Sequence, residues 1–513
     1  MPSLVLLVLI TQYSLAQTKV FKEVSDEISS VIKIIKQDNA TVGYLSFTRL
    51  EKASVDSFSY RLSIMDENLN DIGKVEFKEV GLSLIDVSFD QDVLCLGYIK
   101  TSVKDSTAKQ KKGKATVVKV DQIELVTQFI NLNGAIIKTN SYAITKSVMG
   151  IQIKNISQKG FAVFYGENSN KHLLVFNPKG EQVWHKRVKS DADKFYMLTS
   201  GRDVYILSKK DYVTGSTAVL GGYASVNNEG DFDITGYHTA DTTVETHMAL
   251  KDDQGNQLKV LSFENDPATG KPYIAGCIID PTKAGKYVSG RAVAKSPYFG
   301  VFTININGSK AADMVKKFTY WQDGTLEGVS NRGKFAETDS YAKFIYAFRD
   351  FNGNTYFAGP EMIKRVKWGS IASSVILSPL IVVSPFIIGL VGTSKCKLTD
   401  AILVKQNGQG ALSVENTIPT THSRFFRPLA PVPFFDTKSF YAVNNLETRD
   451  NNLIVDDEKN ITIYSVNKKK VVRTIPHKDG NIKIEVYPAK EGHIMVSEYN
   501  KKEKYTKVSI EAL

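Results

Sequence analysis

A unit of two short apolar strands joined by a tight turn recurs along the chain, and this repetition limits the folds that the chain can adopt. The turns contain Asn-Gly, Asp-Gln-Gly or Pro-Lys-Gly, which accept the positive φ of tight hairpin turns. Apolar and polar residues alternate around them, as in half-buried strands. The chain is therefore predicted to be all-β. The seven copies of the unit begin at Tyr60, Glu124, His172, His247, Gly300, Asp400 and Asn460.

A second element precedes several of these hairpins. It is an apolar strand that ends on glycine, at Gly97, Gly166, Gly276 and Gly359. Four antiparallel strands per unit, repeated with irregular loops, are typical of a β-propeller, in which each blade covers the apolar face of its neighbour. A pair of β-sandwich domains is the alternative, because it has the same strand and turn statistics.

Two of these copies share a longer pattern. Residues 266–276 (DPATGKPYIAG) and 350–359 (DFNGNTYFAG) have in common an Asp, a turn Gly and a Tyr-x-Ala-Gly ending. In these residues the chain resembles exported β-propeller repeat proteins of Bacteroidota-like bacteria, whose repeat core is Asp, Gly-Asn, Tyr and Gly. The resemblance covers two blades, and it implies the propeller fold without a particular activity.

The two ends of the chain predict how the ring closes. Residues 19–24 (KVFKEV) nearly repeat residues 74–80 (KVEFKEV), which form the outer strand of the first hairpin. Residues 481–513 supply three strands without a fourth. An N-terminal strand that completes the C-terminal blade would give seven full blades and one composite blade. We therefore expect eight blades, with seven as the alternative.

The N-terminal segment is predicted to be a secretory signal. Residues 4–10 are apolar and small residues precede Gln17, although no Lys or Arg occurs before Lys19. We expect residues 1–16 to be cleaved, which leaves residues 17–513 as a single propeller domain. Its expected location is the periplasm, the outer membrane or the outside of the cell.

The charge of the chain limits the partners that it can bind, and its cysteine content limits the ways in which its fold can be stabilised. The net charge is +11 and is spread along the chain. Three cysteines are too few for a disulfide framework, and Cys95 and Cys277 lie in apolar runs where buried thiols are expected. Export argues against nucleic acid as a partner. A basic loop, residues 104–114, is instead expected to meet an acidic membrane surface, a glycan or a protein through Lys109, Lys111, Lys112 and Lys114.

Four blades are predicted to carry long insertions between their second and third strands, at residues 100–115, 210–246, 278–298 and 361–398. Such connections emerge on one face of a propeller, so the insertions should gather there. Loops on a rigid scaffold concentrate function, and we therefore predict that this face binds a partner.

The fourth insertion contains the most apolar stretch of the chain. Residues 368–394 run for 27 residues without a charge. A single membrane crossing conflicts with the pairing of the flanking strands, and Ser378-Pro379 and Ser384-Pro385 interrupt the run. Three possibilities remain: a plug packed on the propeller, a loop that inserts into lipid, or an interface for a protein partner. The side chains expected to make the contact are Trp368, Leu380, Ile381, Phe386, Ile387 and Ile388.

Common motifs of catalysis and metal binding are missing from the sequence. It contains no HExxH, GxxxxGK[ST], Gly-x-Ser-x-Gly or Cys-x-x-Cys, and no cofactor or metal is expected. The turn from Asp350 to Asn354 is similar to a calcium loop but lacks its downstream Glu, so its side chains are expected to stabilise the turn. The weak candidates for a metal site lie in a polar hairpin pattern that a solvated strand explains more simply: Asp231, Asp233, His238 and His247.

These patterns favour a non-enzymatic binding or scaffold protein, expected to be a monomer. Its loop-rich face, with apolar loop 368–394 and basic loop 104–114, would dock on a membrane surface, an envelope protein or a glycan. The alternative is a propeller hydrolase or lyase that acts on extracellular polysaccharide or peptide. Three or more carboxylates together with histidines around the central channel would favour the enzyme.

Overall fold

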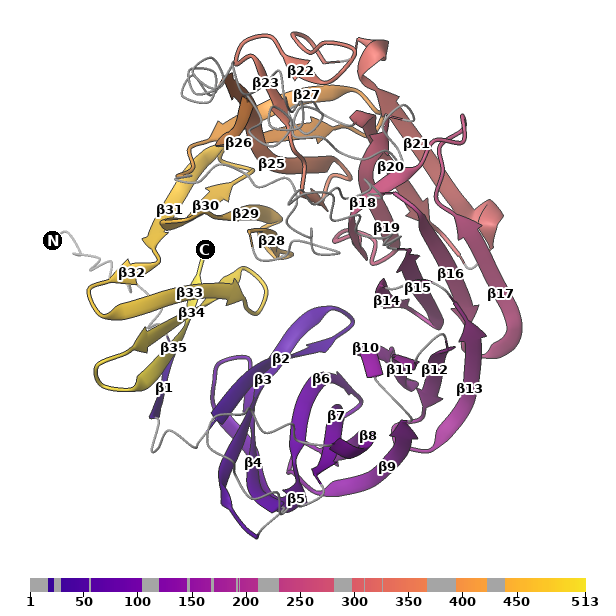
Figure 1. Ribbon diagram of the computed structural model, residues 1–513, viewed down its shortest axis with the longest axis vertical. Helices are drawn as coiled ribbons and strands as arrows, with labels where there is room; N and C mark the ends of the chain where they lie inside the picture. Colours follow the sequence, from indigo (N-terminus) through magenta and orange to yellow (C-terminus); the bar gives the residue numbers. More distant parts are fainter. Residues whose placement is uncertain are drawn as a thin grey trace, which may run out of the picture.

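Eight antiparallel β-sheets stand in a ring around a central axis in the computed structural model of the chain (Figure 1). The strands of each sheet follow one another from the axis outwards, as in the blades of a propeller. The prediction of an all-β propeller with eight blades is confirmed, and the seven-blade and sandwich alternatives are wrong. The structure describes residues 17–22, 29–54, 57–103, 120–144, 148–167, 170–190, 192, 194–210, 230–280, 298–308, 310–324, 326–366, 394–421 and 439–513.

The first four blades follow the chain in order. Blade 1 consists of β2 (Ser29–Gln37), β3 (Ala40–Lys52), β4 (Ser57–Asp66) and β5 (Asp71–Val80). Blade 2 consists of β6 (Leu82–Asp90), β7 (Val93–Val103), β8 (Val120–Asn131) and β9 (Ile136–Ile144). Blade 3 consists of β10 (Val148–Ile156), β11 (Gly160–Glu167), β12 (Asn170–Phe176) and β13 (Gln182–Lys189). Blade 4 consists of β14 (Lys194–Ser200), β15 (Asp203–Lys209), β16 (Phe232–His238) and β17 (Asp241–Ala249).

The other four blades include one with additional elements. Blade 5 consists of β18 (Leu258–Asn265), β19 (Pro272–Ile279), β20 (Tyr298–Ile306) and β21 (Met314–Tyr320), with the short helices η1 (Ala311–Asp313) and η2 (Trp321–Asp323). Blade 6 consists of β24 (Tyr346–Arg349), β25 (Thr355–Val366), β26 (Ser394–Gln406) and β27 (Leu412–Ile418), with a small hairpin of β22 (Lys334–Phe335) and β23 (Ser340–Ala342). Blade 7 consists of β28 (Phe440–Asn445), β29 (Asp450–Asp456), β30 (Asn460–Ser465) and β31 (Lys470–Pro476). Blade 8 consists of β33 (Ile482–Pro488), β34 (His493–Asn500), β35 (Tyr505–Ala512) and β1 (Gln17–Lys22), with β32 (Lys478–Asp479) beside β33.

The last blade joins the two ends of the described chain. β1 is its outermost strand and pairs antiparallel with β35, from Gln17 opposite Ile510 to Lys22 opposite Tyr505. An N-terminal strand therefore completes the C-terminal blade, as the sequence predicts. Hydrogen bonds between strands far apart in sequence close the ring without an open edge at the seam.

The core lies in apolar layers between neighbouring blades. In the layer between blades 2 and 3, the ring centroids of Phe129 and Phe161 are 5.8 Å apart. Cys95 and Cys277 belong to two such layers and are buried, as predicted. Burial raises the pKa of the Cys95 thiol well above its ordinary value. Each blade is thus stabilised by the apolar face of the next, which is why the repeat needs a closed ring.

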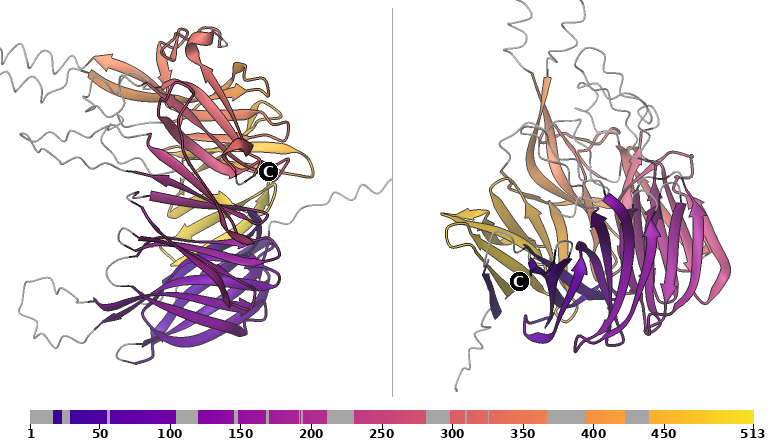
Figure 2. Two further views of the ribbon diagram at one scale, coloured as in Figure 1. Left: turned by 90° about the vertical axis from the view of Figure 1, so that its right-hand side faces the viewer. Right: turned by 60° about the horizontal axis from the view of Figure 1, so that its bottom comes forward.

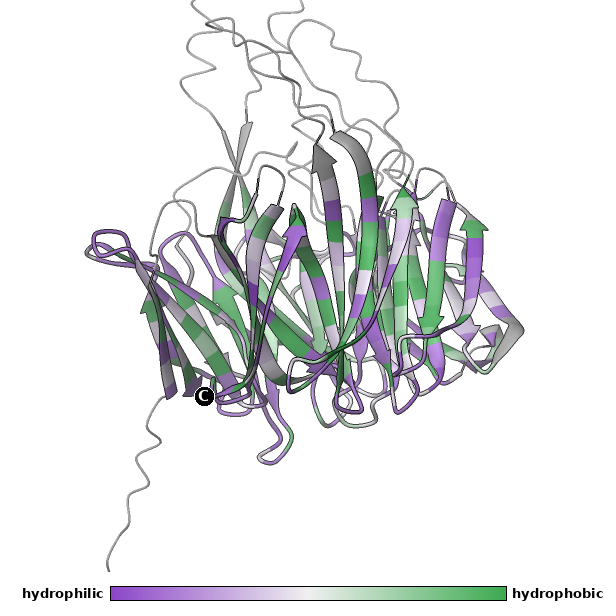
Figure 3. Cartoon of the chain, turned by 90° about the horizontal axis from the view of Figure 1, so that it is seen from below, coloured by the Kyte–Doolittle hydropathy of each residue, from purple (hydrophilic) through white to green (hydrophobic). Residues whose placement is uncertain are grey.

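The two faces of the ring differ in the connections that they carry. The second strand of each blade ends, and the third begins, on one face, which we call the insertion face. The turns between first and second strands and between third and fourth strands lie on the opposite face, which we call the turn face (Figure 3). The four predicted insertions leave from the insertion face, between β7 and β8, β15 and β16, β19 and β20, and β25 and β26.

Two details of blade 4 correct the sequence-based prediction. The predicted insertion at residues 210–246 contains the strands β16 and β17, so only residues 210–231 separate β15 from β16. The predicted hairpin that begins at His247 is also wrong, because β17 and β18 belong to different blades. Its turn joins blade 4 to blade 5. The other six hairpins join the third and fourth strands of one blade, as predicted.

Candidate functional site

The residues predicted to dock on a partner lie outside the described part of the chain. The strands that lead to the apolar loop are described, and they are long: β25 has 12 residues and β26 has 13, whereas β19 and β20 have 8 and 9. In Figure 2 this two-stranded ribbon projects from the insertion face. The predicted contact residues beyond the described ranges are Trp368, Leu380, Ile381, Phe386, Ile387 and Ile388 of the apolar loop and Lys109, Lys111, Lys112 and Lys114 of the basic loop.

The strands β25 and β26 flank the apolar segment in the chain and form a two-stranded ribbon. Its pairing continues as far as Val366 opposite Ser394, so the two ends of residues 367–393 are adjacent. The predicted pairing of the two strands that flank the apolar run is confirmed. The residues on either side of the basic loop are also paired, since Val103 of β7 lies opposite Val120 of β8. Among the described residues there is no helix with the length and apolar character needed to cross a membrane.

The four weak metal candidates do not converge. His247 Nε2 lies 4.0 Å from Asp233 Oδ1. His238 is at the other end of β16, where its Nδ1 lies 2.6 Å from Oδ1 of Asp203. Asp231 precedes β16 with a φ of 106°. In the ranges that the structure describes, no three His, Cys, Asp or Glu side chains are grouped so that they could hold a metal ion.

The turn from Asp350 to Asn354 has the stabilising role that the sequence predicts. Oδ1 of Asp350 accepts hydrogen bonds from the backbone N–H groups of Asn352 at 2.9 Å and Asn354 at 2.8 Å. Oδ2 accepts a third bond, at 2.8 Å, from the amide group of Asn354. The carboxylate is therefore used to satisfy the turn between β24 and β25.

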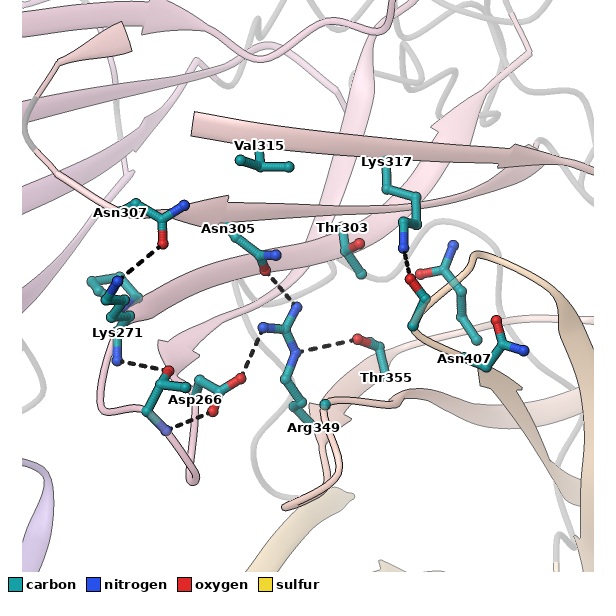
Figure 4. A pocket seen from close by; sticks show the side chains of 15 residues that line it. Asp266, Lys271, Thr303, Asn305, Asn307, Val315, Lys317, Arg349, Thr355 and Asn407 are labelled. Carbon is teal, nitrogen blue, oxygen red and sulfur yellow. Dashed lines mark hydrogen bonds and ion pairs between the residues drawn. The ribbon is translucent and has the colours of Figure 1, made fainter. Parts of the chain in front are cut away.

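A polar pocket of about 350 Å³ lies on the turn face between blades 5 and 6 (Figure 4). Four turns and the strands beside them meet there, because neighbouring blades place equivalent turns side by side. All four turns lie in repeats that the sequence predicts, two in residues 266–276 and 350–359 and two in the hairpins that begin at Gly300 and Asp400, but none of them was predicted to form a site. The lining residues are Asp266, Thr269, Lys271, Pro272, Thr303, Asn305, Asn307, Val315, Lys317, Arg349, Gly353, Thr355, Gln406, Asn407 and Gly408.

Arg349 forms the inner wall of the pocket and joins the two blades. Its Nη1 donates to Oδ2 of Asp266 at 2.9 Å, and both side chains are more than nine-tenths buried. Its Nη2 donates to Oδ1 of Asn305 at 2.8 Å, and the guanidinium carbon lies 4.3 Å from the centre of the Tyr273 ring. A buried cation needs such complete pairing, so Arg349 and Asp266 form a structural ion pair between blades.

Two lysines stand on opposite sides of this pair in Figure 4. Lys271 Nζ donates to Oδ1 of Asn307 at 3.4 Å. Lys317 Nζ donates to the backbone oxygen of Gly408. Neither ammonium group has a carboxylate as its partner among the described residues, and each has three N–H donors. The lining thus contains three cationic groups and one carboxylate, an excess of two positive charges.

The enzymatic alternative predicts carboxylates and histidines around the central channel, so the innermost strands, which surround the axis, test it. The described innermost strands carry four carboxylates, Asp86 and Asp90 on β6, Glu264 on β18 and Glu485 on β33, and they contain no His. Asp86 Oδ2 accepts the backbone N–H of Ile153 at 2.8 Å, and its Oδ1 accepts that of Val87 at 2.9 Å, so this carboxylate joins blades 2 and 3. The combination of several carboxylates and histidines expected for an enzyme is therefore not found on these strands.

Glu264 has an altered affinity for protons. Burial raises its pKa from 4.5 to about 7, although the charge of Lys36 opposes this change. The hydroxyl of Tyr346 donates to its Oε1 at 3.3 Å. The folded protein therefore holds a proton on Glu264 between about pH 4.5 and 7, where the unfolded chain releases it.

Stability should consequently depend on pH through Glu264. Because the folded-state pKa is the higher one, the free energy of unfolding falls as the pH rises through this window. The neutral variant Glu264→Gln should melt above the wild type at pH 8 and close to it at pH 4.5. Thermal unfolding at both pH values measures this, with Glu485→Gln as a control on another innermost strand. An equal difference between Glu264→Gln and wild type at both pH values would contradict the assignment.

Comparisons with known proteins extend the description of the fold. No protein-family model matches the chain, and no curated protein is similar to it in sequence. Among solved structures, the Dos1 propeller matches with a TM-score of 0.45 and 7% identity, over 96% of this chain and 94% of that one. The WD40 domain of SCAP from fission yeast matches with a TM-score of 0.41 and 9% identity, over 96% and 98%. Apo AztD from Citrobacter koseri matches with a TM-score of 0.37 and 9% identity, over 92% and 95%.

Proposed function

We propose that the protein is an exported, non-enzymatic binding or scaffold protein that docks through its insertion face on a membrane surface or an envelope partner. The observation that carries the proposal is the pairing of Val366 with Ser394 at the end of the β25–β26 ribbon. β25 ends and β26 begins on the insertion face, and a 27-residue uncharged segment of the sequence, residues 368–394, lies between them in the chain. An apolar segment of that size needs a partner, a lipid phase or its own core.

The sequence beside the ribbon favours the membrane surface. Lys364, Arg365 and Lys367 precede Trp368, an order suited to an interface where cations meet lipid phosphate and an indole ring lies at headgroup depth. The basic loop leaves from the same face, between β7 and β8. Cationic and apolar contacts from two loops would combine, as stable membrane attachment usually requires two signals.

A flotation experiment tests this proposal. Residues 17–513 should float with vesicles of phosphatidylethanolamine and phosphatidylglycerol, and the double variant Leu380→Asp/Ile387→Asp should remain at the bottom of the gradient. The matched control is Ile136→Asp/Val183→Asp, which changes two apolar side chains that are 49% and 59% exposed on the outer strands of blades 2 and 3. The control should float like the wild type, because it leaves the insertion face unchanged.

The possible outcomes separate the three roles of the apolar segment. If the wild type and both double variants stay unbound and monomeric, the segment is a plug and the docking proposal is wrong. If the wild type does not bind vesicles but co-purifies with an outer-membrane protein, and Leu380→Asp/Ile387→Asp does not co-purify with it, the surface is a protein interface. High salt should weaken vesicle binding, since part of it comes from the basic loop.

A further inference from the structure

We propose that the pocket between blades 5 and 6 is a binding site for an acidic sugar, that is, a hydroxylated ring that carries a carboxylate or a phosphate. The pocket lies on the turn face, opposite the surface proposed to dock, so this inference is independent of the docking proposal. Its residues are all within the described part of the chain.

The positive charge of the pocket favours a negatively charged ligand. Arg349 and Asp266 neutralise one another in the inner wall. Within the described part of the chain, the ammonium groups of Lys271 and Lys317 donate only to an amide oxygen and to a backbone oxygen, respectively. Most of their N–H donors remain available, and a carboxylate or phosphate satisfies such donors better than a neutral group.

The uncharged residues of the lining indicate which other polar groups the ligand carries. Amide and hydroxyl groups dominate it, whereas aromatic side chains do not contribute to it. Asn305 uses Oδ1 to hold Arg349, and the amide of Gln406 donates to Thr319 at 2.8 Å, so both are fixed in place. Fixed amides that can both donate and accept suit hydroxyl groups, which also do both.

The size of the pocket limits the ligand to one or two rings. Its volume of about 350 Å³ is at the lower end of the range of about 300–1,000 Å³ found for small-molecule sites. The site is built on turns that are themselves rigid, since Asp350 and Asn407 each anchor their turn with side-chain hydrogen bonds. A preformed site of this kind binds without the cost of ordering loops.

Calorimetric titration with glucuronate, glucose 6-phosphate, glucose and inorganic phosphate tests the inference. At least one acidic sugar should bind with a Kd below about 1 mM at low salt, and glucose should bind about tenfold more weakly or worse. Glucuronate and glucose 6-phosphate show whether the pocket prefers a carboxylate or a phosphate. Inorganic phosphate shows whether the ring contributes to binding.

Two pairs of variants locate the binding. Lys271→Gln/Lys317→Gln should weaken binding of the acidic sugar by about tenfold or more. Lys310→Gln/Lys316→Gln removes the same charge from exposed lysines near the pocket that do not line it, and it should change the Kd by less than about twofold. Asn307→Ala should weaken the acidic sugar more than inorganic phosphate.

Four results would overturn the inference. The first is that neither acidic sugar binds at about 10 mM. The second and third are that glucose binds as tightly as the acidic sugars, or that inorganic phosphate binds as tightly as glucose 6-phosphate. The fourth is that the two double lysine variants bind the acidic sugar with equal affinity. Melting temperatures of all variants, measured in parallel, show that a loss of binding is not a loss of folding.

Discussion

A variant that begins at Glu23, and therefore lacks β1, should unfold at a much lower urea concentration than one that begins at Gln17. β1 supplies the only pairing partner of the outer edge of β35 among the described strands, over six residues. At about 0.5–1 kcal/mol net for each of roughly six ladder hydrogen bonds, the free energy of unfolding should fall by about 3–6 kcal/mol. The loss acts on the whole ring, because the seam joins its two ends.

Side chains of β1 add to this loss. Phe21 packs against the apolar layer between blades 8 and 1, which includes Met65 and Val508. Lys19 donates to the backbone oxygen of Leu69 at 3.5 Å and pairs with the carboxylate of Asp71, so it holds blade 8 to blade 1. Without β1, the last blade loses its outer strand and the first blade loses contacts across the seam.

A peptide added in trans provides the control for this prediction. A peptide of residues 17–24 should add to the exposed edge of β35 and raise the urea midpoint of the truncated variant, since strand addition restores the same ladder. The same peptide with Phe21→Asp should not. A truncated variant with the same urea midpoint as the protein that begins at Gln17 would show that β1 does not close the ring.

The closing strand was predictable because its evidence is local. Residues 19–24 carry the same alternation as an outer strand elsewhere in the chain, and three C-terminal strands lack a fourth. A pattern of period two specifies both the strand and the face that it buries. Ring closure then follows from the number of strands alone.

The error at His247 has a physical cause. In the turn between blades 4 and 5, Asp252 Oδ1 accepts backbone N–H groups of Gln254 at 3.0 Å and Asn256 at 2.7 Å. In the turn within blade 1, Asp66 Oδ1 accepts those of Asn68 and Asn70, each at 2.8 Å. The two turns have the same local chemistry, so local sequence does not distinguish a turn within a blade from a turn between blades. The difference is that β17 and β18 do not pair with each other: β17 pairs with the preceding strand β16, and β18 pairs with the following strand β19.

The pocket was not predictable for a related reason. Lys271, Lys317 and Arg349 come from separate turns and strands of two blades, and no short motif contains any two of them. One signal was present: the two best-matching repeats, at residues 266–276 and 350–359, lie in consecutive blades, so their turns had to be neighbours. Combining that adjacency with the basic residues of the turns would have placed Lys271 beside Arg349.

Substitution of the glycines that mark the second strands is expected to have the other large effect on stability. Gly276 lies opposite an irregularity in the pairing of β18 between Val260 and Ser262. A Cβ at Gly276 would lie 2.0 Å from the backbone oxygen of Lys259. At Gly359, a Cβ would lie 2.0 Å from the backbone oxygen of Lys343. Such contacts cannot be relieved by rotating a side chain. Each glycine is therefore required by the close approach of a neighbouring backbone, that of β18 at Gly276 and that of the segment between β23 and β24 at Gly359.

Gly276→Ala and Gly359→Ala should therefore each destabilise the protein by about 3 kcal/mol or more, at the upper end of what overpacking costs, because two neighbouring backbone segments must separate. Gly408→Ala is the matched control, since no heavy atom lies within 4 Å of its Cβ position. Urea unfolding of the three variants should place Gly408→Ala beside the wild type and the other two well below it. If Gly276→Ala and Gly359→Ala unfolded with the control, the innermost and second strands would not approach as closely as the register of β18 with β19 requires.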